Sequence, residues 1–296
     1  MVGIITQGRL GNQMFQYAFM YAASKKLNTS FFIFNYNSLH YFKLHNDLEK
    51  NNTKNILKYS LSNLLSRGTV NITIETFKKP IKWLFEWSIY KNICTWKNTT
   101  DKDKFLLSIF HDNTLYDGFF QSEDYFADIS KEIIELFEIK PRFQLEFWQK
   151  KNKLFSKKVI AIHIRRTDYL NFGTAEMGGK NMTLPISYYK KCLFLIEDIE
   201  QYNIIFISDD IAFTKSQFPH KANYFYENND EIIDFQILLV ADILIIANST
   251  FSWWAAWLNN KNNKIIYAPN YFLGFKIGEF YPAGIKVKSW KWIDVN

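Results

Sequence analysis

Residues 157–164 read KKVIAIHI, an apolar run that ends in His163 and Ile164 and continues directly into RRTDY (residues 165–169). The second half contains further apolar runs of this kind: NIIFIS (203–208), NYFYE (223–227), DILIIA (242–247) and KIIYAP (264–269). Stretches that favour helices separate them. Short apolar strands that alternate with helices are typical of a parallel sheet covered on both faces. The second half is therefore predicted to be a parallel α/β layer.

The start of the chain has the same order of strand, turn and helix. Residues 2–6 form an apolar run, and residues 8–13 contain the glycine turn GRLGNQ. Residues 14–27 place apolar side chains at helical spacing and end in lysines, which favours a helix. Residues 31–36 (FFIFNY) predict a second strand. We expect these segments to open an α/β layer of their own.

The length of 296 residues favours about two domains of roughly 150 residues each. Pro141 and the polar run that follows to Lys158 predict a linker, so the expected domains are residues 1–150 and 151–296. Two such halves would face each other across a cleft. Weaker helical signals lie near residues 54–65, 79–92 and 128–137.

Composition excludes several classes of protein. Lys and Arg outnumber Asp and Glu by 36 to 29, which suits an anionic ligand, but no arginine-rich stripe predicts nucleic-acid binding. Cys94 and Cys192 lie far apart, so neither a disulfide framework nor a zinc site is expected. No signal peptide or apolar span of about 18 residues is present, which predicts a cytosolic protein. Peripheral contact with the inner face of the cytoplasmic membrane is left open.

Two arginines follow the strand at residues 157–164, where a parallel sheet binds its ligands. A guanidinium offers a planar pair of donors to phosphate oxygens. Alternation along the strand places His163 and Arg165 on one face and Arg166 on the other, so Arg165 is the candidate phosphate ligand and Arg166 braces the loop. The alternative is a structural ion pair between Arg165 and Asp168.

Two predicted helix starts offer backbone N–H groups to an anion. Asn248 or Ser249 caps the helix that begins with TFSWW, although a cap alone is an equally valid interpretation. The turn from Gly8 to Gln13 allows close approach of the backbone to a ligand. That turn lacks the GxGxxG pattern, so it does not predict a dinucleotide site.

Several carboxylates are candidates for nucleotide binding, metal binding or catalysis. Asp209 and Asp210 follow a predicted strand, where a carboxylate can accept hydrogen bonds from a ribose or base, and helix capping is an equally good interpretation for one of the two. Asp101 and Asp103 match a DxD metal motif, but their polar loop favours a solvated segment, and no metal site is predicted. Glu123 is the candidate general base for an acceptor hydroxyl, and its alternative is a solvated surface residue.

The segments GRLGNQMFQYAF, HIRRTDY, ISDD and NSTFSWWAAWL occur in this order, and with them the chain resembles glycosyltransferase family 11, the α-1,2-fucosyltransferases. The resemblance runs from about residue 3 to residue 275 and is weakest between residues 37 and 112. Thr167 stands where many relatives carry glycine, which leaves the arginines in place.

This resemblance implies a GT-B-like α/β fold of two Rossmann-like halves facing a cleft, with an acceptor-binding half at residues 1–150 and a GDP-sugar-binding half at 151–296. It also implies transfer of fucose from GDP-fucose with inversion, without a cofactor or a divalent metal. The glycan acceptor would be a galactoside of the O-antigen or lipopolysaccharide, and a lipid link is left open. Bacterial origin is expected.

Carried over by motif, the residues that would contact the GDP part of the donor are Gly11, Asn12, His163, Arg165, Asp209, Ser249, Thr250 and Ser252. Of these, Arg165 would also act in catalysis, because it would stabilise the charge on the departing diphosphate. Glu123 is the second catalytic candidate, and the family pattern does not supply its role.

Two rival functions stay open at this point. The first is transfer of another GDP-deoxysugar such as colitose, because the sequence indicates a phosphate site more clearly than a sugar site. The second is a protein that binds nucleotide or glycan without catalysis. A nicotinamide oxidoreductase is disfavoured by the missing GxGxxG pattern.

Overall fold

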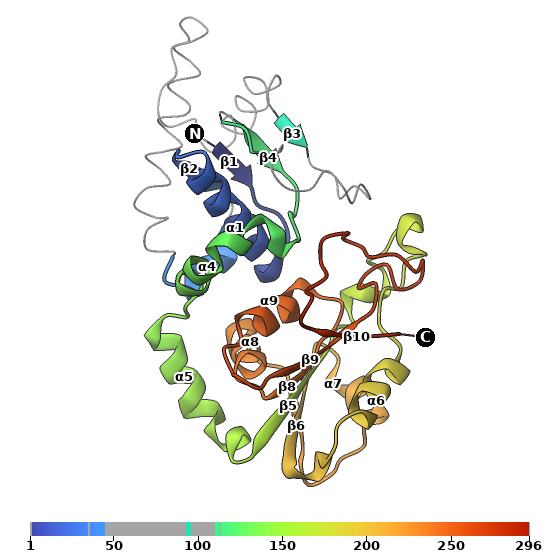
Figure 1. The fold of residues 1–296 in the computed structure, drawn as a ribbon. Coiled ribbons are helices and arrows are strands. Elements are labelled where there is room, and N and C mark those ends of the chain that lie inside the picture. The colour runs from blue at the N-terminus through green and yellow to red at the C-terminus, as the bar shows by residue number, and fades with distance from the viewer. Residues whose placement is uncertain (1, 35, 45–92, 96–109, 113, 296) are drawn as a thin grey trace, which may run out of the picture. The chain divides into compact units, whose positions relative to one another are not determined.

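The chain divides into two compact units, Met1–Glu138 and Ile139–Asn296 (Figure 1). The computed structural model describes residues 2–34, 36–44, 93–95, 110–112 and 114–295. The helices predicted near 54–65 and 79–92 and the aspartates of 101–103 lie outside the described residues.

Unit 1 contains a parallel sheet with the strand order β2-β1-β4-β3. Its strands are β1 (Val2–Ile5), β2 (Phe31–Phe34), β3 (Ile93–Thr95) and β4 (Leu115–Asp117). Because β1 has β2 on one side and β4 on the other, the order of the chain reverses between β1 and β4. The loops that follow these two strands therefore meet at the carboxyl edge of the sheet, where parallel α/β layers bind ligands.

Helix α1 (Leu10–Lys26) buries most of its residues against this sheet. Its Phe19 stacks on Phe120 with ring centres 3.8 Å apart, which fixes the chain after β4 against the helix. The remaining elements described in unit 1 are η1 (Asn37–Tyr41), η3 (Glu123–Tyr125), η4 (Ala127–Ile129) and α4 (Ser130–Leu136). The helix predicted near 128–137 corresponds to α4.

Unit 2 contains a parallel sheet with the strand order β10-β9-β8-β5-β6-β7. Its strands are β5 (Lys158–Ile164), β6 (Tyr202–Ser208), β7 (Tyr224–Glu227), β8 (Ile243–Ile245), β9 (Ile265–Pro269) and β10 (Lys291–Ile293). Numbered from β5, this order is the 3-2-1-4-5-6 arrangement of a Rossmann fold. The four interior strands β5, β6, β8 and β9 are buried apolar runs, as the sequence predicts.

Helices cover both faces of the unit 2 sheet, with α8 and α9 on one face and α6 and α7 on the other (Figure 1). The helices are α5 (Pro141–Lys151), α6 (Ile186–Phe194), α7 (Ile211–Gln217), α8 (Glu231–Leu239) and α9 (Thr250–Leu258), with short turns η5 (Asn152–Phe155), η6 (Asp168–Leu170), η7 (Ala175–Met177) and η8 (Ile199–Gln201). None of the helices in the described ranges is long and apolar enough to cross a bilayer.

The predicted linker from Pro141 to Lys158 is wrong, because most of it forms α5 and η5. Pro141 occupies the first turn of α5, where its missing N–H has no partner to lose. Gln236 of α8 donates a hydrogen bond from Nε2 to the Phe143 carbonyl, which attaches α5 to the rest of unit 2. The boundary between the units accordingly falls at Glu138, N-terminal of the boundary expected at residue 150.

Candidate active site

Several predicted donor-binding residues lie where the strand order of unit 2 reverses. Strand β5 pairs with β8 through Ile162 and Ile245, so both strands end side by side at the carboxyl edge. His163 and Arg165 come at the end of β5, and Ser249 follows β8 and caps α9. Ligands of doubly wound folds bind in the crevice at such a reversal point. The fold therefore brings together the arginine and the helix start that the sequence singles out.

Arg165 is held by two carboxylates and an aromatic ring. Its Nη2 lies 2.7 Å from Asp168 Oδ2, and its Nη1 lies 3.1 Å from Asp209 Oδ2. Its guanidinium carbon lies 5.8 Å from the centre of the Tyr169 ring. Burial on its own would lower the pKa of Arg165, but the two carboxylates outweigh burial and raise it. The guanidinium is thus a fixed charge, and its remaining N–H donors are available to a ligand.

The ion pair with Asp168, which was the alternative interpretation of Arg165, is present and belongs to a larger arrangement around Asp209. Asp209 Oδ1 accepts from the Arg166 backbone N–H at 2.9 Å, and Oδ2 accepts from Thr167 Oγ1 at 2.7 Å. Both oxygens of Asp209 therefore bind the loop that follows β5. A contact between Asp209 and the nucleotide remains a prediction, and its evident structural role is to position Arg165.

Arg166 braces the same loop from the other side, as alternation along β5 predicts. Its Nε lies 3.0 Å from Asp210 Oδ2, and its guanidinium lies 3.5 Å from the centre of the Phe213 ring. Asp210 also caps α7, because its Oδ1 accepts from the Phe213 backbone N–H at 3.0 Å. Of the two neighbouring aspartates, Asp210 is therefore the helix cap and Asp209 the residue that binds the loop.

His163 is a buried, uncharged imidazole beside the start of α9. Only 5% of its surface is exposed, and its ring centre lies 5.4 Å from that of Phe251. Burial, assisted by the positive charge of Arg165, lowers the pKa of His163 to about 3. Its Nδ1 has no hydrogen-bond partner among the described residues. A neutral ring with an open nitrogen suits a hydrogen bond with a ligand better than proton transfer.

The start of α9, the predicted anion site, is tightly packed. Ser249 caps the helix without a side-chain hydrogen bond, so the first-turn N–H groups depend on other partners. Ser252 is fully buried, and its hydroxyl lies 3.2 Å from the Ser249 carbonyl and 3.4 Å from the Ala247 carbonyl. Thr250 is half-buried. Ser249 is buried as well, so Thr250 is the most exposed of the three, and phosphate contact by Ser249, Thr250 and Ser252 remains a prediction.

Hydrogen bonds of glutamine side chains join the two loops at the carboxyl edge of unit 1. Gln16 Oε1 accepts from the Gln7 N–H at 3.0 Å, and Gln16 Nε2 donates to the Gly118 carbonyl at 2.8 Å. Gln121 Nε2 donates to Asn12 Oδ1 at 2.9 Å. These bonds fix the loop after β1 against the loop after β4.

Three predicted residues lie at this edge of unit 1. Gly11 is buried in the first turn of α1, and Asn12 follows it. Gly8 has a φ of +77°, and a β-carbon there would lie 2.3 Å from Asn12 Nδ2, so the turn requires glycine. Glu123 is half-buried and begins η3 directly after the Gln121 loop. All three residues thus belong to unit 1, Gly11 and Asn12 at the start of α1 and Glu123 at the start of η3.

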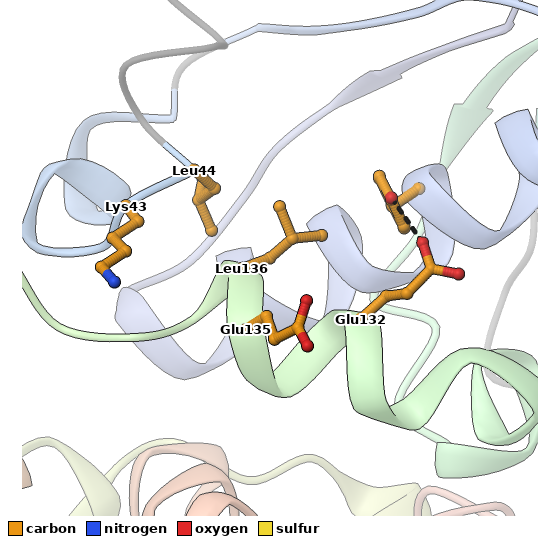
Figure 2. Close-up of a pocket in the computed structure, with 6 residues that line it drawn as sticks. Lys43, Leu44, Glu132, Glu135 and Leu136 are labelled. Carbon is orange, nitrogen blue, oxygen red and sulfur yellow. Dashed lines mark hydrogen bonds between the residues drawn. The ribbon is translucent and has the colours of Figure 1, made fainter.

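A cavity of about 190 Å³ lies elsewhere in unit 1, between α1 and α4 (Figure 2). Tyr21 donates to Glu132 Oε2 at 2.7 Å, and Lys25 lies 3.0 Å from the same carboxylate. Burial, the bond to Glu132 and the nearby acidic charges raise the pKa of Tyr21 to about 12. The lining residues are Tyr21, Lys43, Leu44, Glu132, Glu135 and Leu136. None of them is a predicted site residue.

Sequence reasoning missed two residues of unit 2. One of them, Tyr169, lies at the donor site, where its ring contacts Arg165 and its hydroxyl donates to the Asn248 carbonyl at 3.1 Å. Asp234 is buried in the first turn of α8 and accepts from the N–H and Nδ2 of Asn229. Burial raises the pKa of Asp234 to about 6. A single aspartate within the apolar run EIIDFQILL was the available signal.

The described residues contain no group of three or more His, Cys, Asp and Glu side chains arranged to hold a metal ion. Metal independence therefore stays a prediction that rests on the resemblance. Arg165 and the start of α9 are positive groups of unit 2 that suit an anion.

Comparison with known proteins gives relatives along nearly the whole chain. The O-antigen biosynthesis glycosyltransferase WbnK of Escherichia coli is 28% identical over 88% of this chain and 91% of its own length. The alpha-1,2-colitosyltransferase of Escherichia coli is 27% identical over 93% of this chain and 94% of its own. A protein of Caenorhabditis elegans with the provisional name galactoside 2-alpha-L-fucosyltransferase svh-11 is 24% identical over 95% of this chain and 76% of its own.

The solved structure of a mutant of Arabidopsis thaliana FUT1 in complex with GDP superposes with a TM-score of 0.50, at 10% identity, over 90% of this chain and 69% of that one. This likeness concerns the fold and confirms the GT-B-like α/β prediction. The family model for glycosyl transferase family 11 matches residues 1–290, so the predicted enzyme class, a glycosyltransferase, is also confirmed. The chain belongs to glycosyl transferase family 11.

Proposed function

We propose that this glycosyltransferase moves fucose from GDP-fucose to the 2-hydroxyl of a galactoside, with inversion and without a divalent metal. The observation that carries the proposal is the position of Arg165 at the reversal point of the unit 2 sheet, beside the start of α9. Unit 2 binds the GDP-sugar in this proposal. Unit 1 binds the acceptor and contributes Gly11, Asn12 and the candidate base Glu123.

Charge development on the leaving group explains why Arg165 matters. Cleavage of the bond between the sugar and the diphosphate adds negative charge to the β-phosphate, and groups that bind this charge more strongly in the transition state lower the barrier. Arg165 is charged at working pH like any guanidinium, and Asp168 and Asp209 raise its pKa further. The first-turn N–H groups of α9 add the partial positive charge of a helix N-terminus, which points in a fixed direction.

His163 and Glu123 have separate roles in the proposed reaction. His163 is neutral because of its lowered pKa, so it binds the nucleotide through a ring nitrogen and does not transfer a proton. Glu123 takes the proton of the acceptor hydroxyl as that oxygen attacks the anomeric carbon from the face opposite the diphosphate. Inversion at this carbon follows from a single displacement.

Transfer of colitose is a second candidate function. Its support is the alpha-1,2-colitosyltransferase, which shares 27% identity with this chain, against 24% for the fucosyltransferase-named relative. Both sugars lack the 6-hydroxyl, and the phosphate-binding groups described above serve either donor. The relative named for O-antigen biosynthesis supports a glycan of that class as the acceptor.

The test supplies the purified chain with GDP-fucose or GDP-colitose, a panel of galactosides and EDTA, and follows GDP release and the linkage of the product. We expect one donor to be preferred and a 1,2-linkage to form. Arg165→Ala should lower kcat by about 10²-fold or more, and Arg165→Lys should restore little because the planar pair of donors is lost. Arg142→Ala, which changes an exposed arginine of α5, is the control. Absence of transfer in the wild type, or near-normal turnover by Arg165→Ala, rejects the proposal.

A further inference from the structure

The chain after Arg165 forms a closed loop over residues 169–182. The Met182 N–H donates to the Tyr169 carbonyl at 2.7 Å, and the Gly173 N–H donates to the Lys180 carbonyl at 2.7 Å. A β-carbon at Gly173 would lie 2.2 Å from the Gly179 carbonyl oxygen, so the two sides of the loop approach as closely as a glycine allows. A loop closed in this way holds its own shape.

Asn248 fixes both ends of this loop to the start of α9. This residue is fully buried, and its Nδ2 donates to the Met182 carbonyl at 2.9 Å. Its own carbonyl accepts from the Tyr169 hydroxyl at 3.1 Å. Asn248 directly precedes the helix cap Ser249. The loop is therefore held in a set position relative to the anion-binding tip of the helix.

Phe172 projects from this loop as a supported aromatic surface. Its ring lies nearly parallel to that of Tyr169, at 9°, with centres 5.0 Å apart. Yet 48% of Phe172 is exposed, and within the described part of the chain Tyr169 is its one ring partner. Arg165 contacts the same Tyr169 ring. The exposed ring of Phe172 therefore packs on the same tyrosine that contacts Arg165, the proposed phosphate ligand.

We infer that the outward face of Phe172 is a binding subsite for a pyranose ring. This inference rests on the proposed function, in which a diphosphate occupies Arg165. The C–H groups on one face of a galacto-configured pyranose form an apolar patch, which packs well against the electron-rich face of an aromatic ring. A sugar-binding site commonly joins such an apolar surface to a few polar groups, and here Arg165 and the α9 tip supply the polar part.

The ring held there belongs either to the donor deoxyhexose or to the acceptor galactoside, because both offer an apolar face. Support by Tyr169 keeps the Phe172 side chain ordered before the sugar arrives, so little side-chain entropy is lost on binding. Not every exposed ring has such support. Phe194 of α6, for example, is 90% exposed and has no aromatic partner among the described residues.

The experiment compares Phe172→Ser and Phe172→Tyr with the wild type and with the control Phe194→Ser. It measures kcat, the KM of each sugar substrate and the Kd of GDP, together with saturation-transfer NMR of the free galactoside and of the GDP-sugar, which needs no turnover. Phe172→Ser should raise one KM by about 3- to 10-fold and weaken the NMR signal of the same sugar, with the Kd of GDP within twofold. Phe172→Tyr should restore both values, because it keeps the ring.

A change in the acceptor KM assigns the subsite to the galactoside, and a change in the donor KM with an unchanged Kd of GDP assigns it to the donor sugar. Unchanged KM values and NMR signals for Phe172→Ser overturn the inference, as does an equal effect of Phe194→Ser. If the wild type transfers no sugar, the proposed function fails. The NMR signals then decide the subsite on their own, since its presence predicts a weaker signal in Phe172→Ser.

Discussion

Asp209→Asn should impair catalysis by misplacing Arg165 while leaving nucleotide selectivity intact. Asp209 accepts from the Arg166 N–H and the Thr167 hydroxyl and also pairs with Arg165. An asparagine keeps one acceptor oxygen but loses the negative charge, and its NH2 group faces the Arg165 guanidinium, which cannot accept from it. The loop after β5 then loses its attachment to the end of β6.

The contacts of Asp209 set the size of the expected effect. Hydrogen bonds to a charged acceptor contribute about 1.5–3 kcal/mol each, and two of the three are lost or weakened, so the free energy of unfolding should fall by about 2–4 kcal/mol. A displacement of about 1 Å at a catalytic group can cost about 10²-fold in rate. We therefore expect kcat to fall by about 10- to 100-fold.

The assay pairs urea unfolding with steady-state kinetics and with calorimetric Kd values for GDP, IDP and 2′-deoxy-GDP. A positioning role predicts that all three nucleotides weaken by the same factor, because Arg165 contacts their shared diphosphate. Asp168→Asn is the matched control, since its side chain is 39% exposed and its loss should cost no more than about 1 kcal/mol. A change in selectivity among the nucleotides, or an unchanged kcat, would refute the positioning role.

Three further outcomes follow from described contacts. Gly8→Ala should lower the free energy of unfolding by about 1–2 kcal/mol in urea titrations, because a β-carbon there meets Asn12 and the φ is positive. The pKa of His163, about 3, lies below its unfolded value of about 6.5, so its contribution to stability is lost as pH falls from 6.5 towards 3, by up to about 1.4 kcal/mol per unit. The pKa of Asp234, about 6, lies above its unfolded value, so its contribution is lost as pH rises from about 4 through 6. The two slopes oppose each other, and urea titrations between pH 4 and 6 should show stability rising with pH in Asp234→Asn and falling with pH in His163→Gln.

The sheet of unit 2 could be predicted because buried parallel strands are continuous apolar runs. Strands β5 and β8 lie within KKVIAIHI and DILIIA, and β6 covers NIIFIS and begins one residue earlier. Helix α5 could not be predicted from its pattern, because Phe147 is its one buried residue and its remaining side chains are mostly polar or half-exposed. Pro141 resembles a break between secondary-structure elements, but proline is also favoured in the first turn of a helix, where it lies here.

Only those parts of the site that directly follow a predictable strand could be predicted from the sequence. Arg165 and Ser249 could be chosen because each follows an apolar run, and the carboxyl edge of a parallel sheet collects such residues. The strand order, which places β5 beside β8, cannot be predicted from any local sequence pattern. The bond between Tyr169 and Asn248 joins residues 79 positions apart, and the attachment of Arg166 to Asp209 spans 43. Contacts of this range depend on the completed sheet.

The arrangement around Arg165 also explains how one strand end carries a charged and an uncharged group side by side. Burial and the neighbouring guanidinium lower the pKa of His163, while Asp168 and Asp209 raise the pKa of Arg165. Both pKa values are thereby moved away from neutral pH, so neither group changes its charge there. Arg165 therefore stays charged and His163 stays neutral between pH 5 and 8, so this pair contributes the same charge throughout that range. Proton transfer in the reaction must then depend on a group outside this pair.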